Sequence, residues 1–153
     1  MAVKYTMSSR DVPSDITATL VRDLPTLASE VDFLSLHVPL TPETKHLVNT
    51  SVFRAMKPHA SLINVARGGL VDTDALVDAL ESGLIQGAGI DVTEPEPLPS
   101  DHPLRFHPQC LITPHFAYRS QESLLEVRER VARAAADILG GVHPRPGDVR
   151  LVE

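Results

Sequence analysis

Short apolar runs alternate with segments of helical periodicity along most of the chain. Five runs have the length and composition of buried strands, at residues 2–6, 31–38, 60–66, 86–92 and 110–113. With the helical segments between them they give the order strand, helix, strand, helix, strand, helix, strand, strand, helix. This alternation predicts an α/β fold, a Rossmann-like parallel sheet with flanking helices.

Helical spacing and helix-end signals predict the positions of two helices that precede the C-terminal helix. A short helix is expected at residues 51–56. Another is expected at residues 73–83, where Thr73 can cap the start and Gly83 stands where a left-handed residue ends a helix. The residues that share its apolar face are Leu76, Ala79 and Leu80.

A long C-terminal helix is expected over residues 120–139, and two glycines follow it. We therefore expect one domain over residues 1–141 and a C-terminal tail over residues 142–153. One side of the long helix carries an apolar stripe, which consists of Leu124, Val127, Val131, Ala134, Ala135 and Ile138.

Composition narrows the class of protein. A chain of 153 residues with 42% apolar content can bury one real core. The net charge of −6, with scattered Lys and Arg, argues against nucleic acid or an anionic membrane surface as partner and favours a small molecule or a protein. No segment approaches the roughly 20 apolar residues that span a bilayer. Cys110 is the only cysteine, which excludes an internal disulfide and a cysteine-based zinc site. We expect a cytoplasmic protein without a metal.

Polar side chains follow four of the five predicted strands, directly or within the next loop. Because ligands of open α/β sheets collect at the carboxyl ends of the strands, these side chains are candidates for a site. In chain order they are His37, Thr44, Arg67, Asp91, Glu94, Glu96 and His115.

Taken singly, each of these residues more often has a structural role; as a set they suit the reduction of a 2-keto acid. The planar fork of Arg67 can hold a carboxylate at two points and polarise the adjacent carbonyl. His115 is the best general acid, because imidazole titrates near neutral pH. A carboxylate beside it would keep it protonated. Glu96, whose backbone Pro95 and Pro97 restrict on either side, could be that carboxylate, and Glu94 is its competitor.

Several long blocks resemble one family. "HVPLTPETKHLVN", "LINVARGGLVDTDALVDALESG", "GAGIDVTEPEPLP" and "ITPHFA" are similar to the signature blocks of the D-isomer-specific 2-hydroxyacid dehydrogenases, which include glyoxylate/hydroxypyruvate reductases and phosphoglycerate dehydrogenase. The resemblance covers nearly all of residues 1–141. It implies hydride transfer between a nicotinamide cofactor and a small 2-hydroxy or 2-keto acid, with Arg67, Glu96 and His115 as the catalytic set.

The same resemblance implies the residues that contact the cofactor. Asp91 would bond the nicotinamide carboxamide, with the backbone of Val65 and Ala66 beside the nicotinamide. The adenosine side would be lined by His37, Val38, Pro39 and Thr44, and Arg67 and His115 would also lie at the cofactor. A polar stretch after the first predicted strand slightly favours NADP(H) over NAD, because an arginine with small hydroxyls can accept a 2′-phosphate. Its residues are Ser8, Ser9 and Arg10.

The chain departs from the family at one point. It contains no Gly-x-Gly-x-x-Gly turn, which in this fold holds the pyrophosphate, and its first predicted strand matches the family's second. We therefore expect a Rossmann-like sheet that lacks its first strand and glycine-rich turn. Three explanations stay open: a piece of a longer enzyme, a truncated gene product, or a domain that takes the missing strand from a partner. The first two are favoured.

Two classes of function follow. The leading expectation is an NAD(P)-dependent 2-hydroxyacid dehydrogenase domain, inactive on its own. The alternative is a non-catalytic remnant of the same fold that serves dimerisation or interaction. In either case the resemblance implies a homodimer.

Overall fold

The structure is a computed structural model that describes residues 2–6 and 17–142. Ser8, Ser9 and Arg10 lie outside the described residues, as does the expected tail from residue 143 onward. The chain divides into two compact units, Met1–His115 and Phe116–Glu153.

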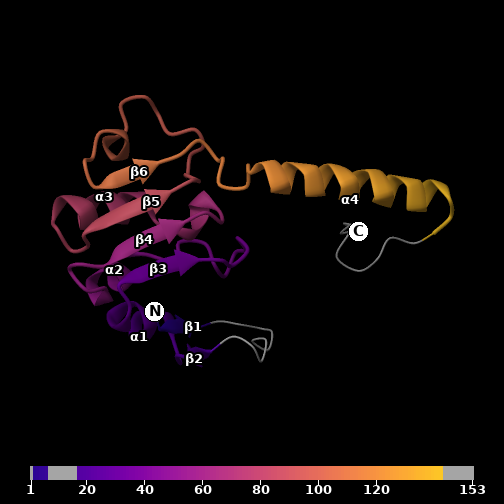
Figure 1. The fold of residues 1–153 in the computed structure, drawn as a ribbon. Helices are drawn as coiled ribbons and strands as arrows, with labels where there is room; N and C mark the ends of the chain where they lie inside the picture. Colours follow the sequence, from indigo (N-terminus) through magenta and orange to yellow (C-terminus); the bar gives the residue numbers. More distant parts are fainter. Residues whose placement is uncertain (1, 7–16, 143–153) are drawn as a thin grey trace. The chain divides into compact units, whose positions relative to one another are not determined.

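Parallel strands form two sheets in the first unit (Figure 1). In one, β1 (Val3–Tyr5) pairs with β2 (Ala18–Leu20). The other has four strands in the order β3 (Phe33–Leu36), β4 (Ser61–Asn64), β5 (Gly87–Ile90) and β6 (Cys110–Ile112). The predicted parallel α/β architecture is confirmed, and each of the five predicted strands is present but shorter than its apolar run.

No apolar pattern in the sequence predicts β2. The strand is only three residues long, and Thr19 and Leu20 are exposed. Because it buries no continuous apolar run, the pattern that predicts a strand is absent there.

Buried residues of the four-stranded sheet lie level with one another on one face. Leu34, Leu62 and Ala88 are paired in register and are all buried. The opposite face leaves Phe33 and Leu111 exposed. One face of the sheet therefore carries the core.

Three helices complete that core: α1 (Leu24–Glu30), α2 (Thr50–Ala55) and α3 (Thr73–Glu81). α2 contacts both α1 and α3. Their buried side chains belong to the same cluster as those of the sheet. The members contributed by the helices include Leu24, Leu27, Val52, Phe53, Leu76, Ala79 and Leu80.

The start of α3 corrects one expectation. Thr73 is not the cap: Asp72 is, and its side chain accepts a hydrogen bond from the Ala75 N–H at 3.1 Å. A carboxylate one residue earlier reaches the first turn, while the Thr73 hydroxyl donates to the Glu94 carbonyl oxygen at 2.9 Å. At the other end Gly83 has a φ of 69°, the left-handed conformation predicted there.

The second unit contains one helix, α4 (Gln121–Leu139), close to its predicted range. Ser120 caps it in a capping box with Ser123, and Gly141 has a φ of 75° beyond its end. Of the predicted apolar stripe only Ala134 is buried. None of the helices in the described part of the chain combines the length and apolar content needed to cross a bilayer.

Candidate active site

The carboxyl ends of β4, β5 and β6 lie along one edge of the sheet. Asn64 is in register with Ile90, and Ile90 with Ile112. Backbone bonds carry this alignment one residue further, because the Asp91 N–H donates to the Asn64 carbonyl at 2.9 Å and the Thr113 N–H to the Ile90 carbonyl at 3.0 Å. Side chains that follow these strands therefore gather at one edge.

The turn after β4 presents Arg67 at the surface. Asn64 is 1% exposed and braces this turn: its Nδ2 donates to the Arg67 carbonyl at 3.0 Å, and its Oδ1 accepts from the Ala66 N–H at 3.1 Å. The exposed guanidinium donates from Nη1 to the Ala66 carbonyl at 2.7 Å. No carboxylate among the described residues forms an ion pair with it, so its fork can receive an anion.

Two glycines follow Arg67 where other segments of the chain pack closely against the turn. A Cβ at Gly68 would lie 2.1 Å from the carbonyl carbon and oxygen of Thr93. A Cβ at Gly69 would lie 3.1 Å from the Leu40 side chain. Neither glycine has a positive φ. A side chain at Gly68 would therefore collide with the backbone of the loop after β5, and one at Gly69 would crowd the Leu40 and Glu94 side chains.

Asp91 is the buried carboxylate of the edge, at 4% exposure. Its Oδ1 accepts a hydrogen bond from the Thr113 hydroxyl at 2.5 Å, and its carbonyl accepts from the His115 N–H at 2.9 Å. The residue therefore fastens the end of β5 to the segment that carries His115.

His115 and Glu96 meet across the loops that follow β6 and β5. Nδ1 of His115 lies 2.7 Å from Oε1 of Glu96, and each side chain is 43% exposed. His115 has a φ of 57°, an uncommon backbone conformation for a side-chain-bearing residue. A carboxylate–imidazole pair is thus present, and its carboxylate is that of Glu96.

Glu94 has different partners. One carboxylate oxygen lies 3.2 Å from His46 Nε2 and the other 3.5 Å from Lys45 Nζ. The hydrogen bond from His46 and the charge of Lys45 hold the pKa of Glu94 below its ordinary value of 4.5. Of the two carboxylates left open by the sequence, the structure joins Glu96 to His115 and ties Glu94 to the loop after β3.

An open recess of about 540 Å³ lies between the loops after β3 and β4. In the loop after β3, the hydroxyl of Thr44 accepts from the Thr41 N–H at 2.8 Å and donates to the Pro39 carbonyl at 2.7 Å. These two hydrogen bonds hold residues 39–44 in a turn. Val65 is exposed at 42%. The recess brings together five predicted cofactor residues and one other; its lining is His37, Val38, Pro39, Leu40, Ala66 and Arg67.

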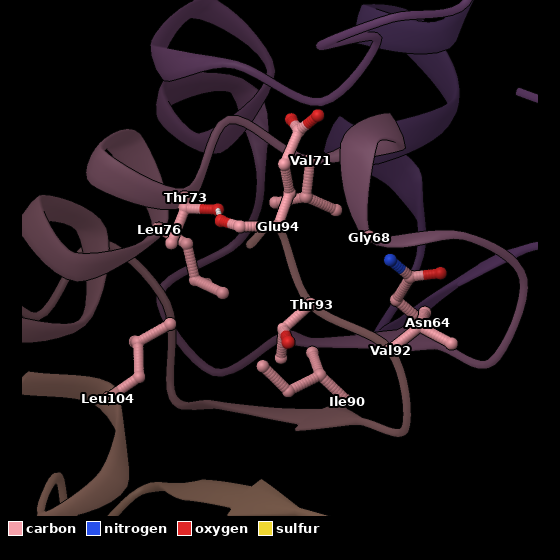
Figure 2. Close-up of a pocket in the computed structure, with 10 residues that line it drawn as sticks. All are labelled: Asn64, Gly68, Val71, Thr73, Leu76, Ile90, Val92, Thr93, Glu94 and Leu104. Atoms are coloured by element: carbon pink, nitrogen blue, oxygen red, sulfur yellow. Dashed lines mark hydrogen bonds between the residues drawn. The ribbon is translucent and has the colours of Figure 1, made fainter. Parts of the chain in front are cut away.

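Behind this edge is a small internal cavity (Figure 2). Its volume of about 10 Å³ has room for about one water molecule. Figure 2 shows Thr73 bonded to the Glu94 carbonyl, while the Glu94 carboxylate points away from Leu104. The cavity is too small for an organic ligand, so the recess is the better candidate for cofactor binding.

The described residues contain no group of three or more His, Cys, Asp and Glu side chains that could hold a metal ion. Cys110, on β6, is half-buried, and its burial raises the pKa of the thiol to about 11. A thiol of this kind is a poor nucleophile at neutral pH.

Comparison with known proteins identifies the family. The profile of the D-isomer specific 2-hydroxyacid dehydrogenase NAD-binding domain matches residues 1–117. The chain belongs to this family. It is 46% identical over 134 residues to a glyoxylate reductase of Thermofilum pendens, a match that covers 88% of this chain and 40% of that protein.

Solved structures share the fold. The TT0316 protein of Thermus thermophilus superposes with a TM-score of 0.84 at 42% identity, covering 95% of this chain and 45% of that one. D-lactate dehydrogenase of Lactobacillus jensenii, solved with NAD⁺, gives 0.85 at 31% identity, covering 94% and 47%. The chain thus spans less than half the length of these two proteins.

Four residues at this sheet edge had been given no role from the sequence. Asn64 braces the Arg67 turn, Thr113 holds Asp91, and Lys45 and His46 hold Glu94. Asn64 could have been found from the sequence, because it is a polar residue within the apolar run of residues 60–66. No sequence pattern pointed to His46, whose φ of 52° depends on the local fold.

Proposed function

We propose that the protein is an NAD(P)-dependent dehydrogenase that interconverts a small 2-hydroxy acid and the corresponding 2-keto acid. The observation that carries the proposal is the Glu96–His115 pair at 2.7 Å, at the same sheet edge as the exposed guanidinium of Arg67. The family membership supports it. To reduce a 2-keto acid, the protein must bind the carboxylate of the substrate and donate a proton to its carbonyl oxygen.

Arg67 binds the substrate carboxylate. Its guanidinium donates two parallel hydrogen bonds to the two carboxylate oxygens, which fixes the plane of the keto acid. The same positive charge polarises the neighbouring carbonyl and stabilises the negative charge that develops on its oxygen.

His115 moves the proton. Its Nδ1 is occupied by Glu96, so the proton passes between Nε2 and the substrate oxygen. Glu96 orients the ring and stabilises the imidazolium form, as a carboxylate does for a catalytic histidine. In the reduction direction His115 donates the proton, and in the oxidation direction it accepts it.

The recess after β3 and β4 suits a dinucleotide, because it combines apolar walls with a cation at its rim. His37, Val38, Pro39 and Ala66 would hold the cofactor, with Thr44 and Val65 beside them and Asp91 and His115 at the nicotinamide end. A bound nicotinamide cofactor supplies or accepts the hydride. Ser8, Ser9 and Arg10 favour NADP(H) slightly, an argument that rests on the sequence alone.

Relatives name the substrate class to be tested first. Glyoxylate reductase and D-lactate dehydrogenase act on small 2-keto or 2-hydroxy acids, as their names state. The test is a chimera in which this chain replaces the matched 134 residues of the T. pendens reductase. Glyoxylate-dependent oxidation of NADH or NADPH that is lost in its His115→Ala variant would support the proposal. A folded chimera without turnover would contradict it and favour the non-catalytic alternative.

The proposal extends to assembly and compartment. A homodimer is supported by α4, where Val127, Val131 and Ile138 are exposed at 53–63%. Sedimentation equilibrium of the purified chain tests it, and a monomer at all concentrations would contradict it. A cytoplasmic location is supported by the single cysteine, which suits a reducing compartment.

A further inference from the structure

Glu94 is held through both its backbone and its side chain. Its carbonyl accepts from the Thr73 hydroxyl at the start of α3, at 2.9 Å (Figure 2). Its carboxylate contacts His46 at 3.2 Å and Lys45 at 3.5 Å, both from the loop after β3. The start of α3 and the loop after β3 thus both hold Glu94 in place within the loop after β5.

His46 is itself fixed to the turn that follows Arg67. Its backbone is left-handed, with a φ of 52°, and its N–H donates to the Gly69 carbonyl at 2.8 Å. The Glu94 carboxylate packs directly over Gly69, because a Cβ built there would lie 3.2 Å from Oε1. The Glu94–His46 contact therefore joins the loops after β3, β4 and β5.

Glu96 lies two residues beyond this fastening. Residues 95–97 are exposed, and the next buried side chain is that of Leu98. The exposed carboxylate of Glu96 reaches His115 from a short segment between Glu94 and the buried Leu98, within which the Pro95 carbonyl also accepts from the Thr93 hydroxyl at 2.8 Å. Displacement of Glu94 would shift Glu96 relative to the imidazole.

We propose that Glu94 is a positioning residue, which through its contacts with His46 and Lys45 holds the Glu96 carboxylate against Nδ1 of His115. This inference gives the Glu94 carboxylate a role in the reaction although it does not reach His115 itself. The catalytic role of the Glu96–His115 pair rests on the proposed function. That Glu94 positions the pair is a geometric statement, which can be tested without measuring enzyme activity.

The chain contains a matched control for the chemistry of Glu94. Asp32, just before β3, contacts Lys57 Nζ at 2.8 Å and His59 Nε2 at 3.1 Å. This is also one exposed carboxylate with one lysine and one histidine, but it precedes the strand instead of following it. Exposed ion pairs contribute little to stability, so Glu94→Gln and Asp32→Asn should each change Tm by no more than about 2–4 °C.

The experiment measures the tautomer of His115 by ¹⁵N NMR in the purified 153-residue chain, at an alkaline pH chosen so that the spectrum shows a neutral imidazole. A carboxylate at Nδ1 favours the Nδ1–H tautomer, so the parent should hold mostly that form. Glu96→Ala removes the acceptor and should lose most of this preference. Glu94→Gln should raise the Nε2–H fraction by about twofold or more, and Asp32→Asn should leave it as in the parent.

A second variant tests the contact from its other side. His46→Asn removes the imidazole but tolerates the left-handed backbone, and it should shift the tautomer in the same direction as Glu94→Gln. An unchanged tautomer in Glu94→Gln, or an equal change in Asp32→Asn, would overturn the proposal. No change in Glu96→Ala would overturn it too, because no pair would then exist to be positioned. None of these results depends on the chimera assay, which tests the dehydrogenase activity separately.

Discussion

Oε1 of Glu96 lies 2.7 Å from Nδ1 of His115, although the residues are 19 positions apart and stand on the loops after two different strands. Glu94, two residues nearer to β5, contacts His46 instead. Two carboxylates that lie two residues apart in the loop after β5 thus have different partners, and only Glu96 contacts the imidazole of His115.

Glu96→Gln should lower kcat for keto acid reduction in the chimera by about tenfold or more, because the amide no longer stabilises the imidazolium form of His115. KM should change little, since Glu96 does not contact the substrate carboxylate in the proposed mechanism. Steady-state kinetics measure both, and Asp101→Asn, in the same exposed region, is the control. A variant with the parent's kcat would remove Glu96 from the mechanism.

Arg67→Lys should lower kcat/KM by about 10- to 100-fold although the charge is kept, because a lysine cannot make the two-point contact with a carboxylate. Arg54→Lys, on the exposed side of α2, should have no effect. The measurement is turnover of the chimera with glyoxylate. Equal activity of the two variants would show that Arg67 does not bind substrate.

The gathering of these residues followed from the sequence because parallel strands place their carboxyl ends at one edge. The apolar runs around Leu34 and Leu62 predicted their strands, since both residues are buried. β2 was missed because its side chains are largely exposed. The contact between Glu94 and His46 also could not be predicted from the sequence. It depends on the left-handed backbone of His46, whose N–H donates to the Gly69 carbonyl.

Gly68→Ala should destabilise the chain by about 1–3 kcal/mol, because the new methyl group meets the backbone of Thr93 and a loop must move. Gly69→Ala should cost less, since its methyl group meets only the ends of the Leu40 and Glu94 side chains. Urea unfolding of the two variants compares them under one condition. A larger loss in Gly69→Ala would contradict the close approach of the two loops.

Cys110 should react slowly with thiol reagents in the folded chain. Burial raises its pKa from 9.0 to about 11, so near pH 8 the thiolate fraction is roughly 100-fold lower than in the unfolded chain. A raised pKa contributes stability below pH 9 that is lost as the pH rises toward 11. Labelling rates with and without urea check the first claim, and a fast reaction of the folded chain would contradict it.

The 153-residue chain alone should bind NADPH about 10²- to 10⁴-fold more weakly than the chimera, and it should not measurably reduce glyoxylate. The pyrophosphate carries the densest charge of the cofactor, and the 153 residues contain no Gly-x-Gly-x-x-Gly turn to hold it. The recess formed by His37, Val38, Pro39, Leu40, Ala66 and Arg67 would have to bind a flexible molecule with nothing fixing its middle. Each charge-assisted hydrogen bond missing there is worth about 1.5–3 kcal/mol, so a few of them account for the expected loss. Fluorescence titration with NADPH measures the binding of both proteins side by side. Saturation of the isolated chain at low micromolar NADPH would contradict the prediction and would mean that another part of this chain, or a second copy of it, holds the phosphates.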